Sequence, residues 1–313
     1  MEKRTLGHPD AKIAPLVLGG NVFGWTADEP TSFQLLDAFI DGGFNAVDTA
    51  NVYSRWAPGH KGGESETVIG NWLASRNRRS DMFLITKTGM DMGDGNVGLA
   101  AKRIIENCEA SLKRLQTDHI DLYFSHAPDA DTPIDETLEA HQKLIDQGKI
   151  RFAGASNYDA AQLAEALKDG EADGKASYTV LQPHFNLMTR DQYEGELEKL
   201  CQNKGLGVIP YFALAMGFLT GKYRSKDDLS KSPRGGRMGD WFTDRNMKLL
   251  DTMEGIAKAH NATMAQVALA WIMARPSVTA PIASATSMDQ LTDIMGAAEL
   301  RFSDYDLEVL NAS

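Results

Sequence analysis

The fold of this chain is decided by residues 83–124, which read Phe83-Leu-Ile-Thr86, then Leu99-Ala-Ala-Lys-Arg-Ile-Ile-Glu-Asn-Cys-Glu-Ala-Ser-Leu-Lys-Arg-Leu115, and finally Ile120-Asp-Leu-Tyr-Phe124. In the middle segment, the apolar residues recur at the spacing of one helix face and the charged residues fall on the other face. The two flanking runs are short and apolar, as buried strands are. A strand, a helix and a second strand in this order predict a βαβ unit with parallel strands.

The same alternation recurs along the whole chain. The predicted strands are Pro15–Leu18, Asn45–Thr49, Phe83–Thr86, Ile120–Phe124, Arg151–Ala155, Thr179–Gln182, Gly207–Tyr211 and Thr279–Ile282. The predicted helices between them are Ser32–Asp41, Ser65–Ser75, Leu99–Leu115, Ile134–Gln147, Asp159–Leu167, Gln192–Asn203, Asp244–His260 and Ser287–Met295. Eight repeats favour an α/β fold with one domain over residues 1–313, a single (β/α)8 TIM barrel. An open doubly wound sheet is the alternative.

Three segments lie outside the repeat. Thr5–Ile13 predicts a small N-terminal hairpin that covers the barrel floor, and Met264–Ala274 predicts an additional helix before the last strand. Arg224–Trp241, after the seventh strand, is rich in charged residues, Gly and Ser and has no periodicity. A loop of this length inside a compact domain is usually functional and often a lid.

Composition excludes several classes of protein. Of the 313 residues, 42% are hydrophobic and 24% are charged, which is typical of a globular protein. The net charge of −11 argues against binding to nucleic acids or anionic membranes. No apolar run reaches the roughly 20 residues that cross a bilayer, and no secretory signal is recognisable, so we expect a cytoplasmic location. Cys108 and Cys201 lack metal-ligand spacing, and no metal site is expected.

Four reactive side chains fall at the ends of three consecutive predicted strands. Asp48 and Tyr53 follow the second strand, Lys87 the third and His126 the fourth. Barrel active sites form at the carboxyl ends of the strands, so the four side chains meet at one mouth. A carbonyl that accepts a hydride needs a proton, and a tyrosine with a pKa of about 10 donates more readily beside an ammonium group. A buried Asp can hold the Lys, and a His can hydrogen-bond the carbonyl oxygen.

Each of these residues alone has a structural explanation. Asp48 could cap a helix, Lys87 could be a surface cation, and Tyr53 or His126 could pack in the core. Their joint position at one barrel mouth favours the catalytic interpretation.

The sequence resembles the aldo-keto reductase superfamily, in the bacterial oxidoreductase branch related to potassium-channel β-subunits. The resemblance rests on Asp48-Thr-Ala-Asn-Val-Tyr53 and on Gly62-Gly-Glu-Ser-Glu-Thr-Val-Ile-Gly-Asn-Trp-Leu73, and it runs from Leu16 to the C-terminal region. It implies a catalytic tetrad of Asp48, Tyr53, Lys87 and His126, with Tyr53 as general acid in reduction and base in oxidation. It also implies a nicotinamide cofactor.

The resemblance further implies the residues that hold this cofactor. Ser156, Asn157 and Gln182 would bind the carboxamide of the nicotinamide, although a Ser-Asn pair could instead cap the next helix. Tyr211 would stack on the nicotinamide ring, and Leu214, Gly217 and Lys222 would clasp the pyrophosphate. The family's usual Ser-Pro after the aromatic is replaced by Phe212-Ala213, so backbone N–H groups have to serve there.

The adenosine end of the predicted site is the most divergent from the family. Ser284 and Thr286 would lie near the 2′-phosphate, and Gln290 and Asp293 near the adenine. Ala283–Gln290 contains no Arg or Lys, and Ile294 replaces a usual Asn. We expect NADP(H), with NAD(H) as the alternative. The missing positive charge would come from Arg224, Arg234 or Arg237 in the long loop.

The predicted substrate is a small aldehyde or ketone, reduced to an alcohol by direct hydride transfer. Trp25, Trp56 and Phe218 are expected to line an aromatic pocket beside the tetrad. One rival function is a nicotinamide-binding module that senses redox state and acts on a partner protein. Another is a barrel of unrelated chemistry, such as a phosphate-binding isomerase or lyase. A homo-oligomer is compatible with the sequence.

Overall fold

The computed structural model describes residues 1–93, 95, 97–172, 175–231 and 235–313, and its eight-stranded sheet is parallel throughout. Each strand pairs with its neighbour in the order β10-β3-β4-β5-β6-β7-β8-β9. The strands are β3 (Val17–Gly19), β4 (Ala46–Asp48), β5 (Phe83–Thr88), β6 (Ile120–Ser125), β7 (Ile150–Ser156), β8 (Tyr178–Gln182), β9 (Gly207–Val208) and β10 (Ile282–Ala283). The predicted alternation of strands and helices is confirmed.

Backbone hydrogen bonds between the last two strand segments close the sheet into a (β/α)8 barrel. Thr279 N donates to Val208 O at 2.8 Å, and Ile282 N donates to Pro210 O at 2.9 Å. The prediction was wrong in the extent of these strands, because β9 is only two residues long and β10 starts only at Ile282. Pro210 and Pro281 explain the difference, since a proline has no N–H to donate to a strand ladder.

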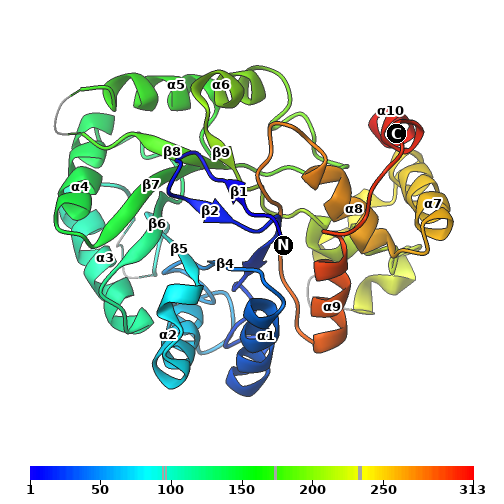
Figure 1. The fold of residues 1–313 in the computed structure, drawn as a ribbon, viewed down its shortest axis with the longest axis horizontal. Helices are drawn as coiled ribbons and strands as arrows, with labels where there is room; N and C mark the ends of the chain where they lie inside the picture. Colours follow the sequence, from blue (N-terminus) through cyan, green and yellow to red (C-terminus); the bar gives the residue numbers. More distant parts are fainter. Residues whose placement is uncertain (94, 96, 173–174, 232–234) are drawn as a thin grey trace.

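Helices surround the barrel (Figure 1). They are α1 (Glu29–Asp41), α2 (Glu64–Arg76), α3 (Ala101–Leu115), α4 (Ile134–Asp146), α5 (Ala160–Asp169), α6 (Glu196–Lys204), α7 (Asp244–Ala259), α8 (Met264–Met273), α9 (Met288–Gly296) and α10 (Asp304–Ala312). The additional helix predicted before the last strand is α8.

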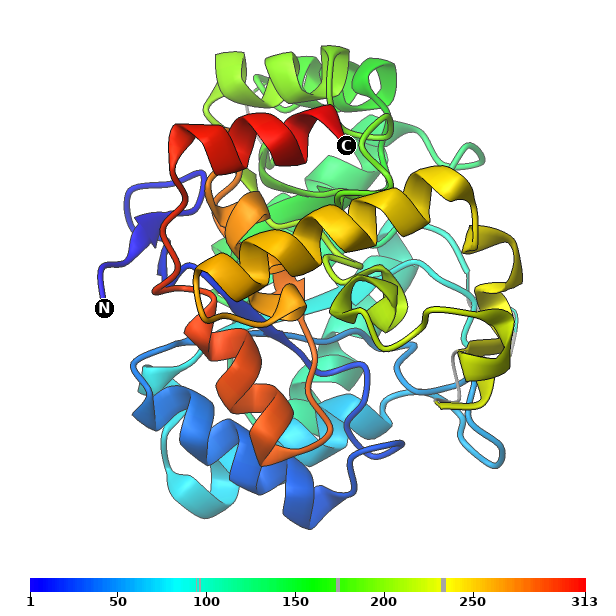
Figure 2. The ribbon, with the colours of Figure 1, turned by 90° about the vertical axis from the view of Figure 1, so that its right-hand side faces the viewer.

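Helix α10 was not predicted. Its start is marked by a capping box in which Ser303 and Asp306 satisfy each other's backbone N–H groups. Figure 2 shows α10 beside α7, and His260 Nε2 lies 3.0 Å from Asp306 Oδ2 at this contact. The capping box was readable in the sequence, but it lies beyond the last unit of the strand–helix repeat.

The N-terminal hairpin closes the amino end of the barrel, as predicted. Strands β1 (Arg4–Thr5) and β2 (Lys12–Ile13) pair antiparallel and lie across the middle of the barrel in Figure 1. Leu6 and Ile13 are fully buried among the apolar side chains of the barrel interior. Gly7 has φ +67°, and a Cβ atom there would lie 1.9 Å from Thr179 O, so only glycine fits this approach.

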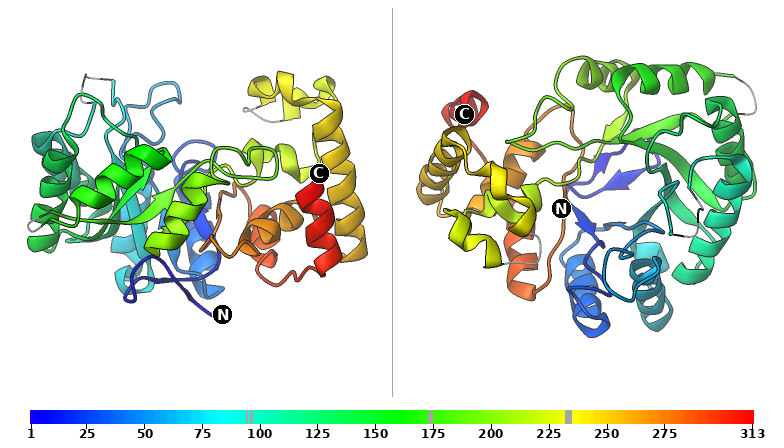
Figure 3. Two further views of the ribbon diagram at one scale, coloured as in Figure 1. Left: turned by 90° about the horizontal axis from the view of Figure 1, so that it is seen from above. Right: turned by 180° about the vertical axis from the view of Figure 1, so that it is seen from behind.

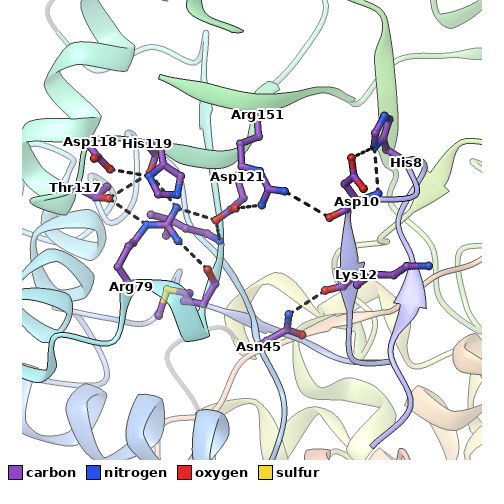
Figure 4. Close-up of polar contacts among 12 residues, drawn as sticks. His8, Asp10, Lys12, Asn45, Arg79, Thr117, Asp118, His119, Asp121 and Arg151 are labelled. Atoms are coloured by element: carbon purple, nitrogen blue, oxygen red, sulfur yellow. Dashed lines mark hydrogen bonds and ion pairs between the residues drawn. The ribbon is translucent and has the colours of Figure 1, made fainter. Parts of the chain in front are cut away.

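A polar network ties the strand starts together at this floor (Figure 4). The Asp121 carboxylate is only 4% exposed and accepts hydrogen bonds of 2.7 Å from both Arg79 and Arg151. The Asn45 amide donates to Lys12 O and accepts from Ala14 N, which attaches β2 to the barrel. These contacts lie at the end of the barrel opposite to the predicted active site.

The described parts of the long segment Arg224–Trp241 lie at the other end. In Figure 3, left, this yellow segment projects on the side away from the N-terminus. Its described parts form the short 3-10 turns Lys226–Lys231, Gly235–Arg237 and Gly239–Trp241. Residues 232–234 lie outside the described residues.

Candidate active site

Asp48, Tyr53, Lys87 and His126 come from three neighbouring strands and meet at the carboxyl end of the barrel. Asp48 is the last residue of β4, Lys87 lies near the end of β5, and His126 directly follows β6. Tyr53 lies in the loop after β4 and is half-buried, whereas the other three side chains are buried. The structure thus brings all four sequence-predicted residues together.

Lys87 lies at the centre of this group. Its Nζ donates to Asp48 Oδ2 at 2.6 Å, to Thr49 O at 2.7 Å and to Tyr53 OH at 3.3 Å. The second carboxylate oxygen of Asp48 accepts a hydrogen bond of 3.0 Å from Gln182 Nε2. The ammonium group is therefore held by Asp48 and presented to the Tyr53 hydroxyl.

Burial brings the proton affinities of Asp48 and Lys87 toward each other. Burial raises the pKa of Asp48, and the charge of Lys87 opposes that rise. Burial also lowers the pKa of Lys87, and the charge of Asp48 opposes that fall. The buried ammonium consequently gives up a proton more readily than a surface lysine does.

His126 faces Tyr53 as a neutral ring. The two ring centroids are 6.0 Å apart at an interplanar angle of 71°. Burial, together with the positive charge of Lys87, holds the pKa of His126 well below 6.5. Its Nδ1 is buried and has no hydrogen-bond partner among the described residues. A neutral imidazole can donate one hydrogen bond, so His126 can orient a carbonyl oxygen without adding a charge.

The residues predicted to hold the nicotinamide lie beside this group and are linked to it. Asn157 adopts a left-handed backbone, with φ +63°, and its Nδ2 donates to His126 O at 2.8 Å. Tyr211 OH donates to Asn157 Oδ1 at 2.7 Å, and Ser156 Oγ donates to Gln182 O at 2.9 Å. Asn157 does not cap the next helix, because the cap of α5 is Asp159.

The segment after Tyr211 has an unusual backbone. Phe212, Ala215, Met216 and Gly217 all have positive φ angles, which turn the chain sharply at the mouth. Lys222 is exposed and makes no ion pair with a described carboxylate. Its Nζ lies close to Gly217, 3.4 Å from where a Cβ atom would be if this residue were not glycine. Leu214 is half-buried on the same turn. The Nζ of Lys222 lies over the ring of Tyr223, 5.1 Å from the centroid, and a cation without a carboxylate partner beside this turn fits a phosphate group.

The predicted adenosine-binding residues are largely occupied by contacts within the chain. Ser284 Oγ donates to Asn21 Oδ1 at 2.5 Å, and Thr286 N donates to Gln290 Oε1 at 2.9 Å. Asp293 Oδ1 accepts a hydrogen bond from Thr263 at 2.7 Å. The hydroxyl and amide groups among these residues can exchange these partners for a ligand. Asp293, in contrast, also binds Thr263, the N-cap residue of α8.

The loop arginines differ in their engagement. Arg224 donates to Asp251 at 2.8 Å and to Glu254 at 2.6 Å on α7. Arg237 is exposed and forms no ion pair with the described residues. Arg234 lies outside the described residues. Of these two arginines, Arg237 is therefore the one whose charge no described carboxylate neutralises.

Aromatic side chains flank Tyr53 on one side. Trp56 packs edge-on against Tyr53 at 5.5 Å and against Trp25 at 5.7 Å, and it is 47% exposed. Phe218 differs from this pair, because it is fully buried against Trp241 and Phe242 under the long loop. Trp56 is thus accessible beside Tyr53, with Trp25 packed against it, whereas Phe218 is inaccessible.

Sequence reasoning missed two residues at the mouth. His184 stacks on the ring of Tyr211, and the side chain of Asn51 is buried without a hydrogen-bond partner among the described residues. Asn51 lies inside the motif Asp48–Tyr53, but only Asp48 and Tyr53 of that motif were given a chemical role. His184 follows Gln182 by two positions, and only the fold shows which ring it meets.

Comparison with known proteins agrees with this geometry. Residues 15–313 match the model of the Aldo/keto reductase family. The chain belongs to this family. As an aldo/keto reductase it is an oxidoreductase, and the family supports nicotinamide-dependent carbonyl reduction in general.

Relatives of this aldo/keto reductase include enzymes and channel subunits. It is 34% identical to the uncharacterized oxidoreductase YrpG of Bacillus subtilis, in an alignment that covers 99% of this chain and 95% of that protein. It is 31% identical to a probable voltage-gated potassium channel subunit beta of Oryza sativa, covering 96% and 92%. It is also 31% identical to the aldo-keto reductase AMT2 of Alternaria alternata, covering 96% and 88%. The predicted branch is confirmed.

Neither a membrane-spanning helix nor a metal-binding cluster is found among the described residues. No described helix has the length and apolar character that a bilayer span requires. No group of three or more His, Cys, Asp or Glu side chains within the described ranges is arranged to hold a metal ion.

Proposed function

We propose that this aldo/keto reductase reduces small aldehydes and ketones to alcohols, with Tyr53 as the general acid. The observation that carries the proposal is the position of Lys87 Nζ, 2.6 Å from Asp48 Oδ2 and 3.3 Å from Tyr53 OH. A positive charge at this distance stabilises a phenolate, so the Tyr53 hydroxyl gains acidity where a carbonyl oxygen needs a proton.

Each residue of the group has one task in this proposal. Tyr53 transfers its proton to the carbonyl oxygen, and Lys87 stabilises the phenolate that is left behind. Neutral His126 donates a hydrogen bond to the same oxygen and fixes its orientation. Asp48 keeps Lys87 in place at 2.6 Å. When bound, a reduced nicotinamide supplies the hydride.

The proposed cofactor is NADP(H), with NAD(H) as the alternative. Ser156, Asn157 and Gln182 would hold the carboxamide, because Asn157 contacts His126 O, Gln182 contacts Asp48, and Ser156 contacts Gln182 O. Gly217 and Lys222 would hold the pyrophosphate. Among the arginines of the long loop, Arg237 would supply the charge that favours a 2′-phosphate.

The proposed substrates carry an aromatic or other apolar group beside the carbonyl. The exposed Trp56, together with Trp25, forms an aromatic wall next to Tyr53. Aromatic pairs of this kind add to the affinity beyond the area they bury. A cytoplasmic location and a homo-oligomer stay predictions of the sequence.

The test joins cofactor binding with turnover. NADPH and NADH are titrated by protein fluorescence, and 4-nitrobenzaldehyde reduction is followed at the nicotinamide absorbance. We expect Tyr53→Phe to lower kcat about 100- to 10,000-fold and to leave the cofactor Kd unchanged. Tyr305→Phe is the matched control, because Tyr305 is 73% exposed on α10. Equal turnover in Tyr53→Phe and the wild type would remove Tyr53 from its proposed role.

A second candidate function rests on the similarity to the rice channel subunit. In that case the chain would bind the nicotinamide cofactor as a redox sensor and act on a partner protein. Cofactor binding without turnover on a broad panel of carbonyl compounds would favour this function over the reductase.

A further inference from the structure

His184 and Tyr211 stack on each other at the edge of the proposed cofactor site. Their ring centroids are 5.3 Å apart and the planes are inclined by only 19°. The two residues are held in register by a parallel β-bridge, in which Tyr211 N donates to Pro183 O at 3.0 Å. The stack is therefore built on backbone contacts between the ends of β8 and β9.

Neighbouring side chains fix the position of His184. Phe212 meets the ring of His184 edge-on at 5.4 Å and the ring of Tyr211 at 5.0 Å. The amide of Asn186 is buried, donates to Phe212 O at 3.0 Å and lies 3.4 Å from His184 Nε2. Its oxygen accepts hydrogen bonds from the backbone N–H groups of the following turn. His184 is thus part of a rigid turn.

Tyr211 in turn reaches the catalytic group. Its hydroxyl donates to Asn157 Oδ1 at 2.7 Å, and Asn157 Nδ2 donates to His126 O at 2.8 Å. The ring of Tyr211 is consequently fixed at its hydroxyl by Asn157 and on one face by His184. Because His184 covers one face, a planar ligand can stack only on the opposite face of this half-buried ring.

We propose that His184 is a positioning residue that backs Tyr211 and turns its opposite face into the platform for the nicotinamide ring. The inference rests on the proposed function. A partly exposed tyrosine loses rotamer freedom when a ligand stacks on it, and a ring that is already held has less freedom to lose. Burial lowers the pKa of His184, so its ring is neutral at neutral pH and the stack is between uncharged rings.

Two substitutions separate the ring of His184 from its hydrogen bonds. His184→Phe keeps a planar ring and loses the nitrogens, whereas His184→Gln keeps a polar amide and loses the ring. We expect His184→Gln to raise the Kd of NADPH about two- to tenfold, and His184→Phe to stay within about twofold of the wild type. With saturating cofactor, we expect kcat to change less than Kd in both variants.

The readout is the NADPH titration, with thermal unfolding measured on each variant. Should His184→Gln not fold, His184→Asn carries the same comparison. An equal Kd in the wild type and both variants would overturn the inference alone. A lower Kd in both variants would also overturn it, because His184 would then occupy the face that the cofactor needs. Absence of nucleotide binding to the wild type would overturn the proposed function and the inference together.

Discussion

Gln182 and Asp48, which are 134 positions apart in the sequence, share a hydrogen bond of 3.0 Å between Nε2 and Oδ1. The other oxygen of Asp48 contacts Lys87 at 2.6 Å, so both carboxylate oxygens are occupied. A residue of the proposed cofactor site therefore supports the residue that holds the central lysine. A substitution of Gln182 in the proposed cofactor site should therefore also change kcat.

Gln182→Met tests this connection. The hydrogen bond from Gln182 lowers the pKa of Asp48 against the effect of burial, so its loss favours the neutral carboxyl and weakens the hold on Lys87. We expect kcat to fall about tenfold or more, together with a higher Kd for the cofactor. Ser156→Ala is the control, because Ser156 contacts Gln182 O and makes no hydrogen bond to Asp48. An unchanged kcat in Gln182→Met would refute the connection.

Removal of Lys87 should affect stability as well as activity. Lys87→Met leaves the buried Asp48 carboxylate without its counter-charge, and we expect a loss of about 3–5 kcal/mol in the free energy of unfolding. The double variant Asp48→Leu/Lys87→Met should recover most of this loss and stay inactive, since an apolar pair needs no charge compensation. Urea unfolding and steady-state turnover measure the two effects. Additive destabilisation in the double variant would contradict the prediction.

Coenzyme preference should depend on Arg237 and not on Arg224. Arg224 is engaged by Asp251 and Glu254, so we expect Arg224→Ala to keep the ratio of NADPH to NADH efficiency (kcat/KM) within about twofold. Arg237→Ala should lower the ratio about tenfold, as the loss of a charge-assisted contact to a phosphate does. The opposite ranking of the two variants would place the 2′-phosphate at Arg224.

Acid should destabilise the fold through His141. This side chain of α4 is fully buried, and burial lowers its pKa from 6.5 to about 4. Below pH 6.5 the unfolded chain takes up a proton that the folded chain refuses, so stability falls as the pH falls toward 4. We expect a loss of about 2–3 kcal/mol between neutral pH and pH 4.5 from this residue. Urea unfolding of His141→Phe across this range should show a shallower pH dependence, and equal slopes would exclude His141 as the cause.

The repeat, the hairpin and the four residues at the strand ends could be predicted from the sequence, because each depends on local periodicity or on the place where a strand stops. Contacts between distant segments could not be predicted in this way. The burial of Phe218 under the long loop and the pairing of Arg224 with α7 both depend on where the loop folds back. The stack of His184 on Tyr211 likewise joins the ends of two neighbouring strands, and which rings meet there depends on how those strands pair. Strand β10 begins only after Pro281, because proline has no N–H for a strand ladder, and the strand pattern alone did not take this into account.

The hairpin at the floor also determines how this protein should be attached to a solid support. The N-terminus lies on the side away from the long loop (Figure 3). A linker joined to the N-terminus therefore anchors the barrel by its closed end. The immobilised protein would present its open end to the solution, where cofactor and carbonyl compounds arrive.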